Sequence, residues 1–158
     1  MEDEELYIAY FQKSAGYYLN VLQKFKNGYR FVFNPYALLA GLLWFLYRKL
    51  YRETIVIVFI SVSINIIENN LFLNPAIQPY SRQIALSVSI LLNASYGIFA
   101  NYFYIKKAIK QVEYAKTNFV NKDEAQSYLY GKGGTTMHPV FILVILFLVS
   151  LLVLNQLK

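Results

Sequence analysis

The chain has 158 residues, of which 57% are hydrophobic, 18% aromatic and only 15% charged. Soluble domains carry about a quarter charged residues, so this composition argues against an ordinary soluble protein, and the length allows one domain. The absence of cysteine excludes disulfides and thiol catalysis. The net charge of +6 is typical of basic cytoplasmic loops, and since no nucleic-acid-binding pattern accompanies it, we expect no nucleic-acid partner.

Residues 1–30 form the first segment, and its acidic start is unlike a cleavable signal. Apolar residues at helical spacing predict an amphipathic helix over 6–27, which Gly28 ends. We expect this helix to lie on the membrane surface or against a partner, because it is too polar to cross a bilayer. The apolar positions are Leu6, Tyr10, Tyr17, Val21 and Phe25.

Residues 31–158 form the predicted membrane domain, which contains four apolar blocks. The block at 31–47 covers only about 25 Å as a helix, which suits a short span, a re-entrant element or an interfacial helix. The blocks at 54–73, 84–105 and 139–154 are predicted transmembrane helices, and Pro75 and Pro79 indicate a turn between the first two of these. The fold class expected is an all-α membrane protein, a small helical bundle with three transmembrane helices.

The region 106–137 is predicted to be a cytoplasmic loop, because it is rich in lysine. The helix of the third block should continue through Tyr114, and Asn121 followed by Glu124 predicts the start of another helix that ends at Gly131. Gly133 and Gly134 indicate a flexible approach to the last span. The same rule places the turn at 74–82 and the end of the chain outside, whereas the side of the N-terminus depends on whether 31–47 crosses.

Two groups of residues resemble a family of bacterial integral-membrane proteins of unknown function. The first group has the pattern FN-x-x-A followed by W-x-x-YRK-x-Y, and the second is a Gly97, Ala100-Asn101-Tyr102, Tyr104 run followed by lysines. Pro35 stands where that family tends to have an aromatic residue. The resemblance implies a membrane protein of the bacterial inner membrane and supplies no activity. The residues of the first group are Phe33, Asn34, Ala37, Trp44, Tyr47, Arg48, Lys49 and Tyr51.

Small and polar residues recur at every fourth position on one face of each of two predicted spans. Such faces let helices approach and hydrogen-bond in lipid, or line a polar path through an oligomer. Glu68 is a further candidate, since ionisable residues inside a membrane are commonly functional, but it lies at the lipid headgroups if the span ends near Ile67. The packing or pore candidates are Ser61, Asn65, Glu68, Asn69, Ser89, Asn93, Gly97 and Asn101.

Basic residues at the ends of the blocks are predicted to contact anionic lipid headgroups; they are Arg48, Lys49, Arg52, Lys106 and Lys107. His138 could serve as a proton relay or be a polar residue at a helix boundary. The stretch 131–136 resembles a phosphate-binding loop only superficially, because the spacing and the preceding strand of that motif are missing.

We expect a non-catalytic multi-pass membrane subunit or scaffold that presents cytoplasmic surfaces to partner proteins. The sequence offers no nucleophile with a base, no metal-ligand set and no cofactor motif, which disfavours an enzyme. The alternative is an oligomeric channel or carrier that uses the polar faces of 54–73 and 84–105. The expected partners are the bilayer and a protein partner or a second copy of the chain.

Overall fold

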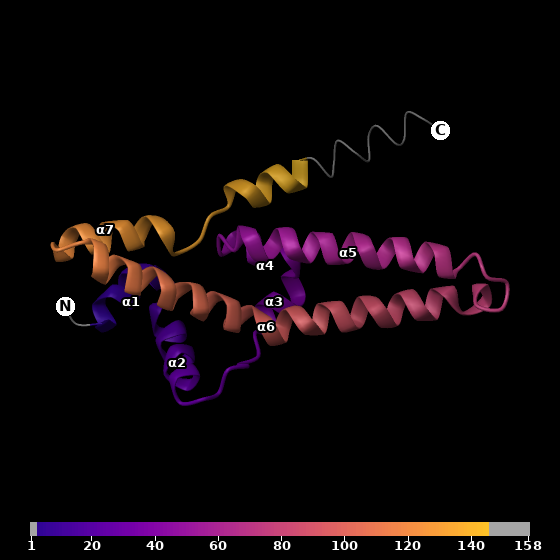
Figure 1. The fold of residues 1–158 in the computed structure, drawn as a ribbon, viewed down its shortest axis with the longest axis horizontal. Helices are drawn as coiled ribbons and strands as arrows, with labels where there is room; N and C mark the ends of the chain where they lie inside the picture. Colours follow the sequence, from indigo (N-terminus) through magenta and orange to yellow (C-terminus); the bar gives the residue numbers. More distant parts are fainter. Residues whose placement is uncertain (1–2, 146–158) are drawn as a thin grey trace.

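The computed structural model describes residues 3–145, which form helices and no strand. Two long helices make a hairpin, and shorter helices gather around one end of it (Figure 1). In chain order the helices are α1 Asp3–Phe11, η1 Gln12–Ser14, α2 Ala15–Lys26, α3 Pro35–Ala40, α4 Leu42–Tyr47, α5 Tyr51–Leu71, η2 Gln78–Tyr80, α6 Ser81–Asn118 and α7 Lys122–Lys132.

The α5–α6 hairpin corresponds to the second and third apolar blocks, with the proline-containing turn between them (Figure 1). Both helices are long and apolar enough to cross a membrane. Their apolar side chains mostly face outward: Ile55 is 69% exposed and Phe59 73%. The predicted helices at 54–73 and 84–105 and the turn are therefore present, and α6 continues past Tyr114 as expected.

The part of α6 before Gly97, which we call the outer part, and the part from Gly97 onward, the inner part, have different surroundings. The helix has 38 residues and is about 57 Å long, well beyond a hydrocarbon core of about 30 Å. Its buried positions begin only at Gly97 and then recur at helical spacing to Ala115. The inner part of α6 is thus the central helix of a packed core, whereas the outer part contacts little of the protein.

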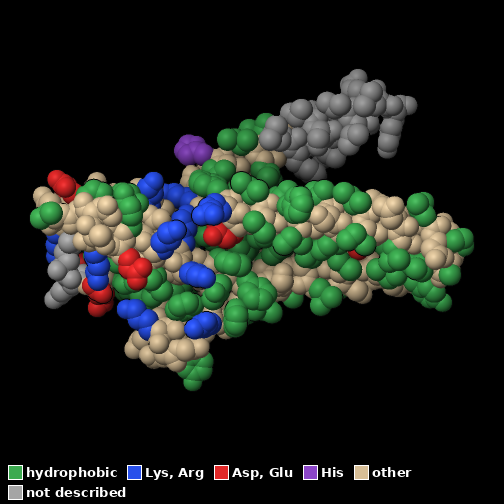
Figure 2. Space-filling model, in the orientation of Figure 1, with side chains coloured by type: hydrophobic (Ala, Val, Ile, Leu, Met, Phe, Trp, Pro, Cys, Tyr) green, Lys and Arg blue, Asp and Glu red, His purple; other side chains and the backbone are tan. Residues whose placement is uncertain are grey.

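We call α1, η1, α2, α7 and residues 97–118 of α6 the head. Its core is rich in aromatic side chains, because Tyr10, Phe11, Tyr18 and Tyr104 meet with ring centroids 4.6–5.8 Å apart. Rings at such separations add packing energy beyond their buried area. Lysine and arginine side chains gather over the head and beside it. On the face shown, none lies over the part of the α5–α6 hairpin that is away from the head (Figure 2).

The prediction of a single amphipathic helix over 6–27 is wrong. The chain breaks at η1, where Gln12 has φ 53°, and α1 and α2 diverge from this point (Figure 1). Tertiary contact accounts for the break, since the Gln12 side-chain nitrogen donates to the carbonyl of Tyr130 in α7 at 2.7 Å. The apolar face packs on α6 and α7 of the same chain: Leu6, Tyr10 and Val21 are buried, although Tyr17 is 45% exposed.

The block at 31–47 is not one crossing helix. An extended segment leads into α3, and Gly41, with φ 53°, separates α3 from α4. Each of these helices is about 9 Å long, far too short to cross a bilayer. A single continuous crossing helix is therefore excluded, and the re-entrant and interfacial readings stay predictions. The block at 139–154 is helical over 138–145 and otherwise lies outside the described residues.

Gly133 and Gly134 do not form the flexible approach predicted from composition. The backbone nitrogen of Gly134 donates to the carbonyl of Tyr10 at 2.8 Å, and both glycines are buried. A Cβ at Gly133 would lie 2.0 Å from that carbonyl oxygen, so only glycine permits the approach. This segment therefore fastens the end of α7 to the end of α1.

Candidate functional site

Asn34 and Asn101 join the extended segment before α3 to the middle of α6. The Asn34 side-chain nitrogen donates to Oδ1 of Asn101 at 2.9 Å, and its own Oδ1 caps α3 by accepting from the nitrogen of Ala37. Asn101 in turn donates to the Tyr17 hydroxyl and to the carbonyl of Val32. Both amides are buried and partnered, as buried polar groups must be for a stable core.

The small and polar residues of α6 contact different parts of the molecule. Gly97 admits Phe33 and Leu38: a Cβ there would lie 2.7 Å from the Phe33 ring. Asn93 donates to the carbonyl of Ser89 in its own helix at 2.9 Å and is exposed. Gly97 and Asn101 therefore pack against the 32–38 segment.

The polar residues of α5 are mostly bonded within that helix. Ser61 donates to the carbonyl of Ile57, and Asn69 donates to Oδ1 of Asn65. Ser61 and Asn65 also line a shallow groove toward Tyr96 of α6. Glu68 differs, because one of its carboxylate oxygens is enclosed without a hydrogen-bond partner among the described residues.

Arg48, at the end of α4, is the most unusual charged residue in the structure. Its side chain is buried, at 9% exposure, and its guanidinium lies over the rings of Tyr18 and Tyr104, at 4.7 and 5.2 Å from their centroids. Nη2 donates to the Ser14 hydroxyl at 3.1 Å, whereas Nε and Nη1 have no hydrogen-bond partner within residues 3–145. Burial of an unpaired charge is costly, and cation–π contacts offset only part of that cost.

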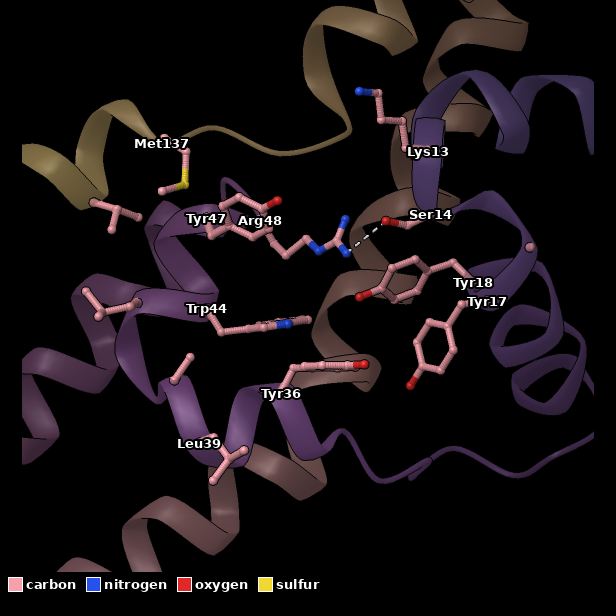
Figure 3. A pocket seen from close by; sticks show the side chains of 14 residues that line it. Lys13, Ser14, Tyr17, Tyr18, Tyr36, Leu39, Trp44, Tyr47, Arg48 and Met137 are labelled. Atoms are coloured by element: carbon pink, nitrogen blue, oxygen red, sulfur yellow. Dashed lines mark hydrogen bonds between the residues drawn. The ribbon is translucent and has the colours of Figure 1, made fainter.

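A cavity of about 690 Å³ lies beside this guanidinium, and we call it the Arg48 pocket. It lies between η1 and α2 on one side and α3 and α4 on the other, and Met137, from the segment after α7, also lines it (Figure 3). The rings of Tyr36 and Trp44 extend into it from α3 and α4. Burial raises the pKa of Tyr18, opposed by the charge of Arg48, so this hydroxyl stays protonated at neutral pH. The residues that line the Arg48 pocket are Lys13, Ser14, Gly16, Tyr17, Tyr18, Tyr36, Leu39, Ala40, Leu43, Trp44, Tyr47, Arg48, Met137 and Val140.

Lys49 is a second junction, next to Arg48. It has φ 59°, and the nitrogens of Lys49 and Leu50 donate to the carbonyls of Leu46 and Phe45, which is a Schellman cap on α4. Its Nζ donates to the carbonyl of Gly131, and its own carbonyl accepts from Lys107 Nζ at 2.6 Å. This residue thus links α4, α6 and α7.

The five predicted headgroup anchors therefore differ in their surroundings. Arg52 and Lys106 are exposed, whereas Lys49 and Lys107 are half-buried and Arg48 is buried. Contact with lipid headgroups stays a prediction for all of them, and Arg48 can meet a headgroup only inside its pocket. His138 is exposed at the start of the helical residues 138–145. Residues 3–145 contain no group of three or more His, Cys, Asp or Glu that could hold a metal ion.

Sequence reasoning missed the Arg48 pocket. The run Tyr47-Arg48-Lys49 after an apolar block is typical of a basic membrane boundary, and in such a boundary all the cations are expected at the surface. The rings that enclose Arg48 come from α2 and α6, far away in the sequence. The signal that was available is the density of tyrosine, 15 in the chain, of which Tyr10, Tyr18 and Tyr104 are buried in the core of the head.

The matching family model is described as "Protein of unknown function (DUF2628)" and covers residues 13–110. The chain therefore belongs to this family, which agrees with the resemblance to an uncharacterised family. The matched region runs from η1 through the hairpin and includes Arg48, Asn34 and Asn101. No curated protein and no solved structure matches the chain.

Proposed function

We propose that the protein is a non-catalytic multi-pass membrane subunit or scaffold, whose α5–α6 hairpin crosses the bilayer and holds the head at the cytoplasmic face for partner proteins. The main support for this proposal is a difference along α6. The apolar side chains of its outer part and of α5 are exposed, whereas its inner part lies inside a packed core. Exposed apolar surface of this extent is stable in lipid and unstable in water.

The distribution of charge supports the cytoplasmic position of the head. The stretch of α6 from Gln83 to Ile105 carries no charge, and Lys106, Lys107 and Lys110 follow it directly. The turn between α5 and α6 carries no charge, and Arg82 at the start of α6 is the basic residue nearest to it. Basic residues are enriched on the cytoplasmic side, so this asymmetry favours a head in the cytoplasm and, in a bacterium, the inner membrane as the location.

The head offers an open groove between α1 and α7 as the surface for a partner. Ile8 and Tyr130 line it and are 44% and 61% exposed. Glu5, Asp123, Gln126 and Ser127 add polar groups at its sides. Aromatic and aliphatic side chains surrounded by polar groups are typical of transient protein interfaces.

A photo-crosslinking amino acid at Ile8 or Tyr130 tests the proposed role in living cells. We expect a discrete protein adduct from these positions and none from Phe59, which is 73% exposed on α5. Adducts from Phe59 with none from the head would contradict the scaffold proposal. They would favour instead an oligomeric channel or carrier.

One observation favours that alternative, namely the enclosed and unpartnered oxygen of Glu68 in a helix that could cross a membrane. Intramembrane carboxylates commonly line ion pathways. The bonds of Ser61, Asn69 and Asn93 within their own helices support the packing role more than a polar path. Ion flux in proteoliposomes, lost on Glu68→Gln, would decide for a channel.

A further inference from the structure

We propose that the Arg48 pocket binds the phosphate of an anionic phospholipid, with an acyl chain of that lipid along the apolar wall of the pocket. The inference rests on the proposed position of the hairpin in the membrane, because the ligand would enter from the bilayer. Three features support it: the contacts of Arg48, the residues that line the pocket, and the apolar surface beside the pocket.

The guanidinium is the first part of the argument. It is nine-tenths buried and lines the cavity, and its Nε and Nη1 are enclosed by protein with no acceptor among the described residues. Within residues 3–145 no carboxylate forms an ion pair with it. Planar guanidinium groups recognise phosphate oxygens through charge-assisted hydrogen bonds. Because no carboxylate among these residues balances the buried charge of Arg48, an anion in the cavity beside it would do so.

The walls of the pocket select an amphiphile over a small hydrophilic anion. Hydroxyl groups of Ser14 and Tyr47 lie at the end that holds Arg48 (Figure 3). Apolar side chains also line the cavity, namely Leu39, Leu43, Met137 and Val140. A free phosphate ion would leave those side chains facing water, whereas a lipid covers them with its chain.

The position of the pocket relative to α6 indicates where the ligand comes from. Leu38 of α3 lies against Gly97, within the uncharged stretch of α6 that ends at Ile105. Next to it, Tyr36 and Leu39 line the pocket and are 73% and 84% exposed. The opening thus lies beside apolar surface, close to the level where the basic residues begin. Headgroups and the first methylenes of lipid chains occupy that level of a bilayer.

Trp44 allows a direct test, because it is the single tryptophan of the chain and lines the pocket. The full-length protein is placed in nanodiscs of phosphatidylcholine that contain either phosphatidylglycerol or further phosphatidylcholine with brominated chains. Bromine on a lipid chain quenches tryptophan on contact. We expect brominated phosphatidylglycerol to quench Trp44 at lower lipid fractions than brominated phosphatidylcholine does.

Substitutions of Arg48 separate binding in the pocket from general attraction of anionic lipid. Arg48→Gln should weaken the apparent affinity for phosphatidylglycerol roughly tenfold, the loss of one charge-assisted contact, and Arg48→Lys should keep part of it. Lys24→Gln is the matched control, because it removes one positive charge from exposed α2 surface outside the pocket. Equal quenching by both lipids, or an unchanged preference in Arg48→Gln, would overturn the proposal.

A second variant tests the pocket without touching the core. Gly16 lines the pocket, and nothing lies within 4 Å of the position of an added Cβ. Gly16→Phe should abolish the preference for phosphatidylglycerol, whereas Gly16→Ala should keep it. Persistence of the preference in Gly16→Phe would contradict binding in this cavity. Inorganic phosphate should not relieve the quenching; relief would identify a site for the free ion and contradict a lipid ligand.

The two proposals fail in different ways. If the protein does not enter nanodiscs, the proposed membrane position is wrong. If it enters them and Trp44 shows no preference for the anionic lipid, the membrane position stands and the lipid site is wrong.

Discussion

The side chains of Asn34 and Asn101, 67 positions apart in the sequence, are hydrogen-bonded at 2.9 Å and each is 1% exposed. This bond fixes the start of α3 against the middle of α6. Because α4 follows α3 directly, the same bond helps to position Arg48 and the wall of its pocket.

Removal of this bond should destabilise the protein measurably. Asn101→Ala leaves the buried amide of Asn34 without an acceptor, which costs about 1–3 kcal/mol in the free energy of unfolding. Asn34→Asp keeps the cap on Ala37 but loses the donated bond, so it separates capping from the link to α6. Asn93→Ala is the control, since Asn93 is exposed and bonded within α6. Unfolding in detergent that is the same for Asn93→Ala and Asn101→Ala would contradict this account.

The close approach of Gly133 to Tyr10 predicts a large effect from one methyl group. Gly133→Ala should destabilise the docking of α7 by about 1–3 kcal/mol, because the added carbon overlaps a backbone oxygen. Gly131→Ala should be neutral or stabilising by up to about 1 kcal/mol, since Gly131 is helical and has open space around it. Limited proteolysis near residue 133 measures the difference, and equal cleavage rates would count against the fastening role.

Lys49 should tolerate glycine far better than a β-branched residue. Its left-handed backbone costs a non-glycine residue roughly 1–2 kcal/mol. Lys49→Gly removes that cost but loses the bond to Gly131, so the thermal midpoint should change little. Lys49→Val adds steric strain at the same φ and should lower the midpoint clearly. A Lys49→Val variant as stable as Lys49→Gly would show that the cap contributes little.

The ion pair of Asp3 with Lys116 predicts a limited dependence on pH. A hydrogen bond from Lys116, assisted by its charge, lowers the pKa of Asp3 below its ordinary 3.8. A depressed carboxyl pKa contributes stability above the ordinary value, and this is lost as pH falls through the folded-state value. Asp3→Asn should therefore lower the thermal midpoint slightly at neutral pH and not in acid. Glu4→Gln removes the same charge one residue away, and an equal effect would refute the pairing.

The long helices could be predicted because their signals are local. An uncharged apolar stretch such as 83–105 determines a helix of membrane length whatever surrounds it. The cap at Asn121 is equally local: its side chain accepts from the nitrogen of Asp123, although α7 runs one residue beyond the predicted end.

The breaks and the pocket depend on contacts between distant segments. Gln12 leaves the helical conformation where α7 and Gly134 meet it, and neither is apparent from residues 6–27. Arg48 belongs to a basic run that reads as surface, yet Tyr18 and Tyr104 enclose it from other helices. The four-residue spacing on α6 includes Gly97 and Asn101, which are buried, but also Ser89 and Asn93, which are exposed, and it does not show that α3 covers Gly97.

Cysteine accessibility tests the membrane-crossing hairpin most directly, because the chain contains no cysteine of its own. Ala76 lies exposed in the turn between α5 and α6, and Ser127 lies exposed on α7. A membrane-impermeant maleimide applied to intact bacterial cells should label Ala76→Cys, and should label Ser127→Cys only after the membrane is disrupted. Labelling of both positions in intact cells, or protection of both until disruption, would place the turn and the head on one side and contradict the crossing.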